Sequence, residues 1–323
     1  MTDLKRRAVL RSLSTLAGAS ILVPAAGATK ISPLSPAQSD KAVAGLNRGI
    51  PSSDNFEVSE IQKDATRADG LIPEFTFDTF VAGKANAQAI ALAQQAAAFP
   101  EFAFNPLSAF NPFFIYGDVG RGKTHLMHAI GNKILERNPL ACVRYVHAYT
   151  FLDEVIESYR RKTFDEFKKR YASLDAFLID DVHLLNGRER TQEELLVIFD
   201  KLQERGGVIV MADIHAPKEW FPDAYRDLMN CRIFPKLLTA SAFELGSANM
   251  ELRCNVLRAK AMTMGKDVVP DEETIRFIAA RVSSGCIREL ESALRNVVAY
   301  SRFNGLEISV RVARHALAGI TLG

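Results

Sequence analysis

The fold is decided by one stretch, Gly117-Asp118-Val119-Gly120-Arg121-Gly122-Lys123-Thr124, which matches the pattern G-x-x-x-x-G-K-[ST] at every fixed position. It follows the apolar run 113–116, which has the composition of a short buried strand, and a helix is expected to begin near Lys123. The glycines allow a tight turn in which successive N–H groups point at phosphates, and the helix dipole adds to the attraction. The stretch therefore predicts a phosphate-binding loop.

Two side chains of the loop and two acids downstream have distinct expected roles. Lys123 would reach the β- and γ-phosphates of ATP, and the Thr124 hydroxyl would bind Mg²⁺. The apolar strand 177–179 ends in Asp180 and Asp181, at the sheet edge that the loop shares. We expect Asp180 to hold the Mg²⁺ shell and Asp181 to polarise the attacking water. The alternative is a solvated strand end that carries acids by accident.

Strands and helices alternate along the middle of the chain, which predicts the α/β class, a parallel sheet covered by helices on both faces. Besides 113–116, strands are expected at 143–147, 176–179 and 208–211, and helices at 85–98, 150–159 and 190–204. From about Ala248 only helices are expected, at 250–264, 271–282, 286–303 and 309–318. The predicted domains are an α/β nucleotide-binding domain, 71–247, and a small helical domain, 248–323.

The composition is that of a soluble globular protein, with 323 residues of which 48% are hydrophobic and 24% charged. Forty basic and 38 acidic residues leave a net charge of +2, so attraction to nucleic acid must come from local patches. No apolar run reaches the roughly 18 residues that a membrane-spanning helix needs. The cysteines lack metal-ligand spacing and are expected to be idle thiols: Cys142, Cys231, Cys254 and Cys286.

The first seventy residues differ from the rest. Lys5-Arg6-Arg7 precede the apolar stretch 13–23 and the small residues 25–28, a layout similar to a twin-arginine export signal. The alternative is a basic, partly helical tail on a cytosolic protein. Because an ATPase has no fuel outside the cytoplasm, we favour a cytoplasmic location. Residues 29–70 have the composition of a flexible linker.

Several further segments share one family resemblance: 75–81, Asn86, Asn111-Pro112, His125-Leu126 after the loop, 178–181, 188–194 and 287–291. Together they resemble the AAA+ ATPase module of the bacterial replication initiators of the DnaA family, over about residues 75–320. The resemblance implies a P-loop AAA+ sheet with an all-α lid. It also implies head-to-tail self-association into a helical filament that holds single-stranded DNA along its inner channel.

The resemblance assigns further roles around the nucleotide. It places Phe80, Val81 and Asn86 in the segment that cradles the adenine, and His125 beside the loop residues Gly117, Asp118, Gly120 and Gly122. Asp213, just after the strand 208–211, matches the family's first sensor of the γ-phosphate. Arg288 matches the second sensor arginine, which reaches over the nucleotide; the alternative is a surface arginine paired with Glu291.

The arginine finger, which reaches a neighbour's ATP, is placed by the resemblance at Arg232. The sequence departs from the family on both sides of it. The run 214–217 stands where the family has Arg and then Pro, and 233–236 replaces a glycine-tryptophan signature. Arg226 is therefore a rival for the role.

The ends of the chain also depart from the family pattern. The sequence stops at Gly323, just past the last expected lid helix, so the family's C-terminal helix-turn-helix is not expected in it. Residues 1–70 do not resemble the family's N-terminal helicase-contacting domain.

Contacts to single-stranded DNA are implied at Leu152, Arg188 and Arg190. The alternative for the two arginines is a solvated turn. The basic runs 160–162 and 168–170 add positive charge nearby, although Asp165 and Glu166 dilute it.

Three functions follow from these features. The favoured one is an ATP-binding, slowly hydrolysing AAA+ protein in DNA replication initiation. The alternatives are a truncated paralogue that acts as an adaptor and stimulates hydrolysis on a true initiator, and a loader-type ATPase that escorts another enzyme, such as a helicase, to DNA. The complete loop and both strand-end acids favour an active ATPase over an inert scaffold.

Overall fold

The computed structural model describes residues 68–98, 111–220, 236, 239–265 and 268–318, all of them in one compact unit, Val58–Gly323. The export-signal segment 1–28 and both candidate finger residues, Arg226 and Arg232, lie outside these residues. Within the described part, no helix combines the length and apolar character needed to cross a membrane. Its three cysteines are free thiols.

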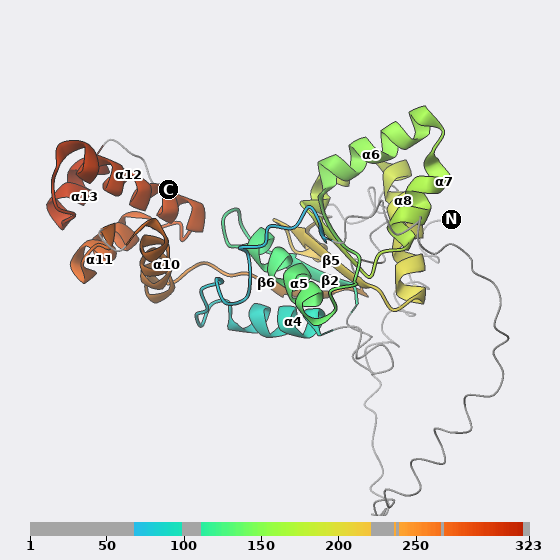
Figure 1. Ribbon diagram of the computed structural model, residues 1–323, viewed down its shortest axis with the longest axis horizontal. Coiled ribbons are helices and arrows are strands. Elements are labelled where there is room, and N and C mark those ends of the chain that lie inside the picture. Colours follow the sequence, from blue (N-terminus) through green and yellow to red (C-terminus); the bar gives the residue numbers. More distant parts are fainter. Residues whose placement is uncertain (1–67, 99–110, 221–235, 237–238, 266–267, 319–323) are drawn as a thin grey trace, which may run out of the picture. The chain divides into compact units, whose positions relative to one another are not determined.

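A six-stranded sheet in which every pairing is parallel forms the centre of the α/β domain, in the order β1-β3-β4-β5-β2-β6; β5, β2 and β6 are labelled in Figure 1. The predicted α/β class is confirmed. The strands are β1 (Ala68–Asp69), β2 (Phe113–Tyr116), β3 (Val143–His147), β4 (Ala176–Asp180), β5 (Val208–Asp213) and β6 (Ser241–Glu244). β4 and β5 each run on to an aspartate, so both acids stand at the carboxyl edge of the sheet, where ligands bind in such folds.

The strands are buried on both faces because their side chains alternate between two hydrophobic cores. In β4, Phe177 and Ile179 enter one core, while Ala176 and Leu178 enter the other. One face is covered by α6 (Ala148–Arg161), α7 (Phe164–Ala172) and α8 (Glu189–Glu204), and the other by α4 (Ala87–Ala97) and α5 (Lys123–Arg137) (Figure 1). These layers hold the phosphate loop at the end of β2.

Two strands were not expected from the sequence. β1 pairs with β3 at the sheet edge, where the Arg144 guanidinium forms an ion pair with Asp69. It lies in the segment that was interpreted as a linker. β6 pairs with β2 on the other side, and the Leu245 N–H extends the ladder by donating to the Tyr116 carbonyl at 2.7 Å.

The C-terminal part forms a small helical lid with its own hydrophobic core. Its helices are α10 (Met250–Met264), α11 (Glu272–Arg281), α12 (Ile287–Asn304) and α13 (Val310–Ala316). The Asp271 carboxylate caps α11 by accepting a hydrogen bond from the Thr274 N–H, and Gly305 ends α12 in the left-handed conformation.

Candidate nucleotide-binding site

The phosphate loop joins β2 to α5 and depends on its glycines. Gly117, Gly120 and Gly122 have φ angles of 144°, 73° and 98°, a region that side-chain-bearing residues rarely adopt. A Cβ on Gly117 would lie 2.5 Å from the Leu245 carbonyl oxygen. The loop is thus a tight turn that leads directly into the N-terminus of α5 at Lys123.

Lys123 is buried at the base of the loop, with 7% of its surface exposed. Its Nζ donates to the carbonyl oxygens of Gly117 at 2.6 Å and Asp118 at 2.9 Å. Burial lowers the pKa of Lys123, and the nearby Asp180 and Asp181 carboxylates oppose that shift. The Asp118 carboxylate is exposed and pairs with Arg121 at 3.0 Å, so Asp118 contributes its backbone to the loop.

Thr124 and Asp180 come together as a pair of oxygen donors. The Thr124 hydroxyl donates to Asp180 Oδ2 at 2.7 Å, across the gap between α5 and the end of β4. Asp180 is 2% exposed, and burial raises the pKa of its carboxyl, an effect that the hydrogen bond from Thr124 opposes. A hydroxyl and a carboxylate beside a phosphate loop are the hard ligands that Mg²⁺ prefers. These residues therefore fit the expected metal.

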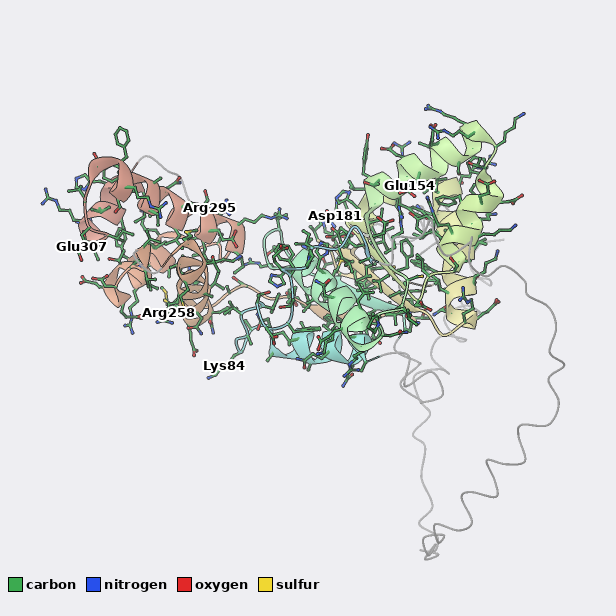
Figure 2. All side chains as sticks on the ribbon, in the orientation of Figure 1. Lys84, Glu154, Asp181, Arg258, Arg295 and Glu307 are labelled. Atoms are coloured by element: carbon green, nitrogen blue, oxygen red, sulfur yellow. The ribbon has the colours of Figure 1, made fainter. Side chains whose placement is uncertain are left out.

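Asp181 follows at the open end of β4 in the left-handed conformation, with φ 54°. It lies at the sheet edge and lines the cavity described below (Figure 2). His147 Nε2 lies 2.9 Å from Asp181 Oδ2, a contact that the sequence analysis missed. The parallel register of β3 and β4 sets His147 opposite Asp180, which brings the imidazole to the same edge.

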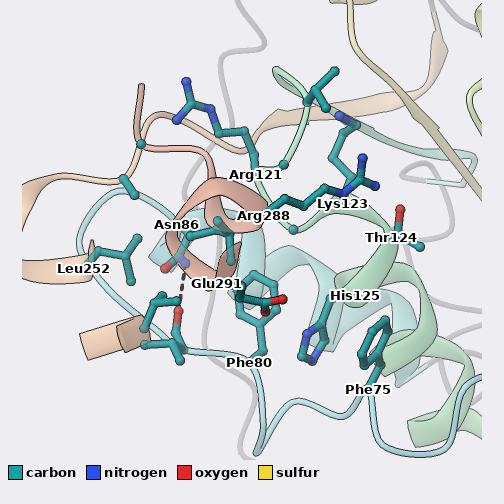
Figure 3. A pocket seen from close by; sticks show the side chains of 18 of the residues that line it. Phe75, Phe80, Asn86, Arg121, Lys123, Thr124, His125, Leu252, Arg288 and Glu291 are labelled. Atoms are coloured by element: carbon teal, nitrogen blue, oxygen red, sulfur yellow. Dashed lines mark hydrogen bonds between the residues drawn. The ribbon is translucent and has the colours of Figure 1, made fainter. Parts of the chain in front are cut away.

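A cavity of about 320 Å³ opens above the loop (Figure 3). Ten residues expected at the site line it: Phe80, Val81, Asn86, Gly120, Gly122, Lys123, Thr124, His125, Asp181 and Arg288. The lid helices add apolar walls through Leu252, Val256 and Ile287, which sequence reasoning missed. Apolar walls on one side and a phosphate loop on the other suit a ligand with a flat base and an anionic tail.

Asn86 and His125 shape the wall of the cavity. The Asn86 amide donates to the Val81 carbonyl at 3.0 Å, drawn as a dashed line in Figure 3, and its oxygen accepts from the Gly83 N–H at 2.7 Å. Asn86 therefore holds the loop that precedes α4. The His125 ring stacks on Phe75 with 4.5 Å between centroids, and burial lowers its pKa, which keeps the imidazole neutral.

The lid contributes Arg288, whose side chain extends toward Lys123 and Thr124 (Figure 3). Glu291, which the sequence offered as a surface ion-pair partner for Arg288, instead pairs with Lys260 at 2.6 Å. Arg288 therefore lines the cavity as expected, and its role over the phosphates stays a prediction.

The phosphate loop and the lid are also joined by direct hydrogen bonds. The Ile287 N–H donates to the Gly120 carbonyl at 2.8 Å, and Arg121 Nη1 donates to the Ser284 carbonyl at 2.8 Å. Arg121 carries no signal of this role in the sequence, because Ser284 lies far along the chain.

Asp213 reaches the sheet edge but is already fully engaged. Its side chain is 0% exposed, and its carboxylate accepts from the backbone N–H groups of His183 at 2.6 Å and His215 at 2.9 Å. The next residue, Ile214, lines the cavity. The role of Asp213 as a γ-phosphate sensor stays a prediction.

The residues expected at DNA lie on packed neighbouring elements. Leu152, on α6, is half-buried against the core beneath that helix. Arg188 precedes α8 and is exposed, and Arg190 lies over the Tyr159 ring of α6, 4.3 Å from its centroid. Leu152 and Arg190 thus lie on α6 and α8, which touch through the Arg190–Tyr159 contact, and Arg188 stands immediately before α8.

The basic runs on α6 and α7 are less positive than their sequence indicates, because acids on neighbouring turns and helices pair with them. The pairs are Arg161–Glu157 at 2.6 Å, Lys168–Glu194 at 3.0 Å and Arg170–Glu154 at 2.7 Å (Glu154 is labelled in Figure 2). The exposed Arg188 is therefore a stronger candidate for a contact with a DNA phosphate than the basic runs 160–162 and 168–170.

The parallel sheet, phosphate loop, strand-end acids and helical lid define a P-loop ATPase module of the AAA+ class. Residues 71–226 match the family model for the bacterial DnaA ATPase domain. A solved replication initiator DnaA, bound to AMPPCP and single-stranded DNA, is 30% identical, with a TM-score of 0.60 over 74% of this chain and 69% of that one. The chain therefore belongs to the DnaA family.

Other relatives agree. The initiator DnaA of Nitrosospira multiformis is 42% identical over 247 residues, 76% of this chain and 49% of the relative; that of Ralstonia nicotianae is 39% identical over 305 residues, 93% and 54%. The crystal structure of domain III of Thermotoga maritima DnaA is 29% identical, with a TM-score of 0.68 over 78% of this chain and 99% of that one. The chain spans about half the length of the Nitrosospira multiformis and Ralstonia nicotianae initiators.

The match with the Ralstonia nicotianae initiator leaves only 7% of this chain uncovered, which is fewer than seventy residues. The matched region therefore includes part of residues 1–70. The curated relatives are chromosomal replication initiators, which lends no support to reading the twin-arginine-like layout at 1–28 as an export signal.

Proposed function

We propose that this chain binds and slowly hydrolyses ATP with Mg²⁺ as an AAA+ module of DNA replication initiation or its regulation, in the cytoplasm. It does so as a head-to-tail assembly that holds single-stranded DNA. The observation that carries the proposal is the Thr124–Asp180 pair, at 2.7 Å, beside a glycine loop that opens into a cavity. The family membership supports the same reaction.

We propose a role for each residue in the reaction, and the positions of the residues support it. The phosphates would lie over the loop N–H groups, and Lys123 Nζ would exchange its carbonyl partners for phosphate oxygens. Thr124 and Asp180 would hold Mg²⁺, which would neutralise phosphate charge. Asp181 accepts a hydrogen bond from the attacking water and orients it, and Arg288 stabilises the charge that develops on the transferred phosphoryl group.

The two strand-end acids should be separable by mutation. Asp181→Asn should leave ATP binding intact and slow hydrolysis about 100-fold or more, because only the acid that positions the water is lost. Asp180→Asn should instead weaken Mg²⁺-dependent binding. Phosphate release and equilibrium binding at varied Mg²⁺ measure the two effects, with Asp153→Asn on the exposed side of α6 as the control. Parental hydrolysis in both variants would show that these carboxylates are structural.

Single-stranded DNA binding is proposed at Arg188, Arg190 and Leu152. The support is their placement on α6 and at the start of α8, joined by the Arg190–Tyr159 contact, and the relative that was solved with AMPPCP and single-stranded DNA. Exposed guanidinium groups bind phosphates, and a nearby apolar side chain contacts the sugar or base.

Arg188→Ala should weaken binding to a single-stranded oligonucleotide and lower the slope of log affinity against log salt by about 0.7, the value for one lost phosphate contact. Arg190→Ala should act in the same direction. Arg276→Ala, an exposed arginine on α11, is the matched control and should leave both quantities unchanged. An unchanged salt slope in Arg188→Ala would place the DNA elsewhere.

The adaptor alternative differs in which protein hydrolyses ATP. An adaptor would stimulate hydrolysis by an added full-length initiator even when its own Asp181 is replaced by asparagine. If the chain is instead the proposed ATPase, its Asp181→Asn variant would lose its own hydrolysis and would not stimulate hydrolysis by the added initiator.

A further inference from the structure

Tyr145 joins the metal-binding end of β4 from the neighbouring strand. It lies in the middle of β3, and its hydroxyl donates to Asp180 Oδ2 at 3.0 Å, the oxygen that also accepts from Thr124 at 2.7 Å. The other oxygen, Oδ1, accepts from the Asp181 N–H at 2.9 Å. The buried carboxylate is therefore held by three donors. Thr124 belongs to the phosphate loop and Asp181 directly follows β4, whereas Tyr145 comes from the neighbouring strand, β3.

The Tyr145 hydroxyl is a dependable donor. Its burial and the neighbouring Asp180 charge raise its pKa above the ordinary value, so the phenol keeps its proton. A protonated phenol beside a carboxylate donates its hydrogen bond to the charged form and favours that form.

The Tyr145 ring is fixed in place by its neighbours. The His128 ring lies 4.1 Å from it between centroids, and His128 is 1% exposed. Burial lowers the pKa of His128 to about 4, so its imidazole is neutral, and its Nδ1 accepts from the Ile72 N–H at 3.3 Å. The hydroxyl is thus presented to Asp180 from a rigid support.

We propose that Tyr145 is a positioning residue for Mg²⁺, acting through Asp180; this rests on the proposed function of the site. Asp180 can bind the cation only when its carboxylate is held in the direction of the loop. The Tyr145 hydroxyl, together with Thr124, fixes that direction by donating to Oδ2. Hydrogen bonds to a metal-binding carboxylate from such supporting residues contribute about 10- to 100-fold to metal affinity.

The variant Tyr145→Phe tests this because it keeps the ring and removes only the hydroxyl. We expect the Mg²⁺ concentration that gives half-maximal gain in ATP binding to rise about 10-fold. ATP binding in EDTA should match the parent. Both quantities are measured by equilibrium binding of labelled ATP, without turnover.

The matched control is Tyr171→Phe. Tyr171 is 0% exposed, and its hydroxyl donates to a carboxylate too, Glu154 Oε2 at 2.9 Å, but it is a residue of α7 and its side chain lies in the core with Phe151 and Phe177. We expect it to lower the thermal unfolding temperature and to leave the Mg²⁺ requirement unchanged. An equal Mg²⁺ shift in both variants would overturn the inference, because the effect would then be one of general stability.

A double variant tests whether Tyr145 acts through Asp180. In an Asp180→Asn background, Tyr145→Phe should add nothing to the Mg²⁺ requirement, since the group it positions has gone. Full additivity of the two substitutions would overturn the inference. If Tyr145→Phe keeps the parental Mg²⁺ requirement, the inference about Tyr145 is overturned and the proposed function still stands. If the parent protein shows no Mg²⁺-dependent ATP binding, the proposed function is overturned as well.

Discussion

Lys123→Ala should abolish ATP binding, with a loss of at least about 100-fold, as expected when one partner of a buried charged contact is removed. Lys123 Nζ is the cation of the phosphate loop and is held at its base by two loop carbonyls. Without it the loop itself offers the triphosphate only backbone N–H groups and a helix dipole, and Arg288 approaches from the lid alone. Equilibrium dialysis with labelled ATP measures the effect.

Lys133→Ala is the matched control for this experiment. Lys133 belongs to the same helix, α5, but it is partly exposed and pairs with Glu136 at 2.8 Å on the helix surface. Its loss should leave ATP binding unchanged. Lys123→Met, which keeps most of the apolar stem, should behave as Lys123→Ala does. Undiminished binding in both Lys123 variants would place the nucleotide at another site.

Loss of the arginine finger should reduce hydrolysis on the order of 10³-fold in the assembly and spare ATP binding by the mutant itself. The reason is that a finger acts across a subunit boundary, on the ATP of a neighbour. Arg232 is the first candidate and Arg226 its rival, and both lie outside the described residues. Each should therefore be replaced by alanine separately, with hydrolysis followed as phosphate release.

Mixing identifies the finger directly. A finger variant keeps a working nucleotide site, while a Lys123→Ala partner lacks the site and keeps its finger. If Arg232 is the finger, the mixture that contains Arg232→Ala should recover part of its hydrolysis, and Arg226→Ala alone should be near normal. Recovery with Arg226→Ala would transfer the role to Arg226. Full activity in both single variants would exclude neighbour-assisted hydrolysis and favour the adaptor role.

Much of the site could be predicted because its chemistry is local in the sequence. The phosphate loop is contiguous, and its glycines are needed for backbone geometry that the structure contains, such as φ 98° at Gly122. The strand that carries Asp180 is an apolar run that ends in acids, so its edge position followed from the alternation of strands and helices. The lining residues Phe80 and Arg288 followed from the family resemblance alone.

The rest could not be predicted because it depends on pairs that are far apart in the chain. Arg121 and Ser284 meet across the loop and lid, and Tyr145 meets Asp180 across two strands. Ser284 and Tyr145 belong to no motif, and Arg121 fills a variable position of the phosphate loop. The two hydrogen bonds that the Asp213 carboxylate accepts from backbone N–H groups are equally invisible in the sequence, because any residue type at His183 or His215 other than proline would donate them.

By itself the sequence determined the α/β class, the phosphate loop, the acid pair and the helical lid, since periodicity, caps and a contiguous motif specify local structure. Only the tertiary structure decided the strand order β1-β3-β4-β5-β2-β6. It also decided that Ala68–Asp69 and Ser241–Glu244 are strands. Segments of two and four residues are too short for a periodic pattern, and they become strands because β3 and β2 offer unpaired N–H and C=O groups at the sheet edges.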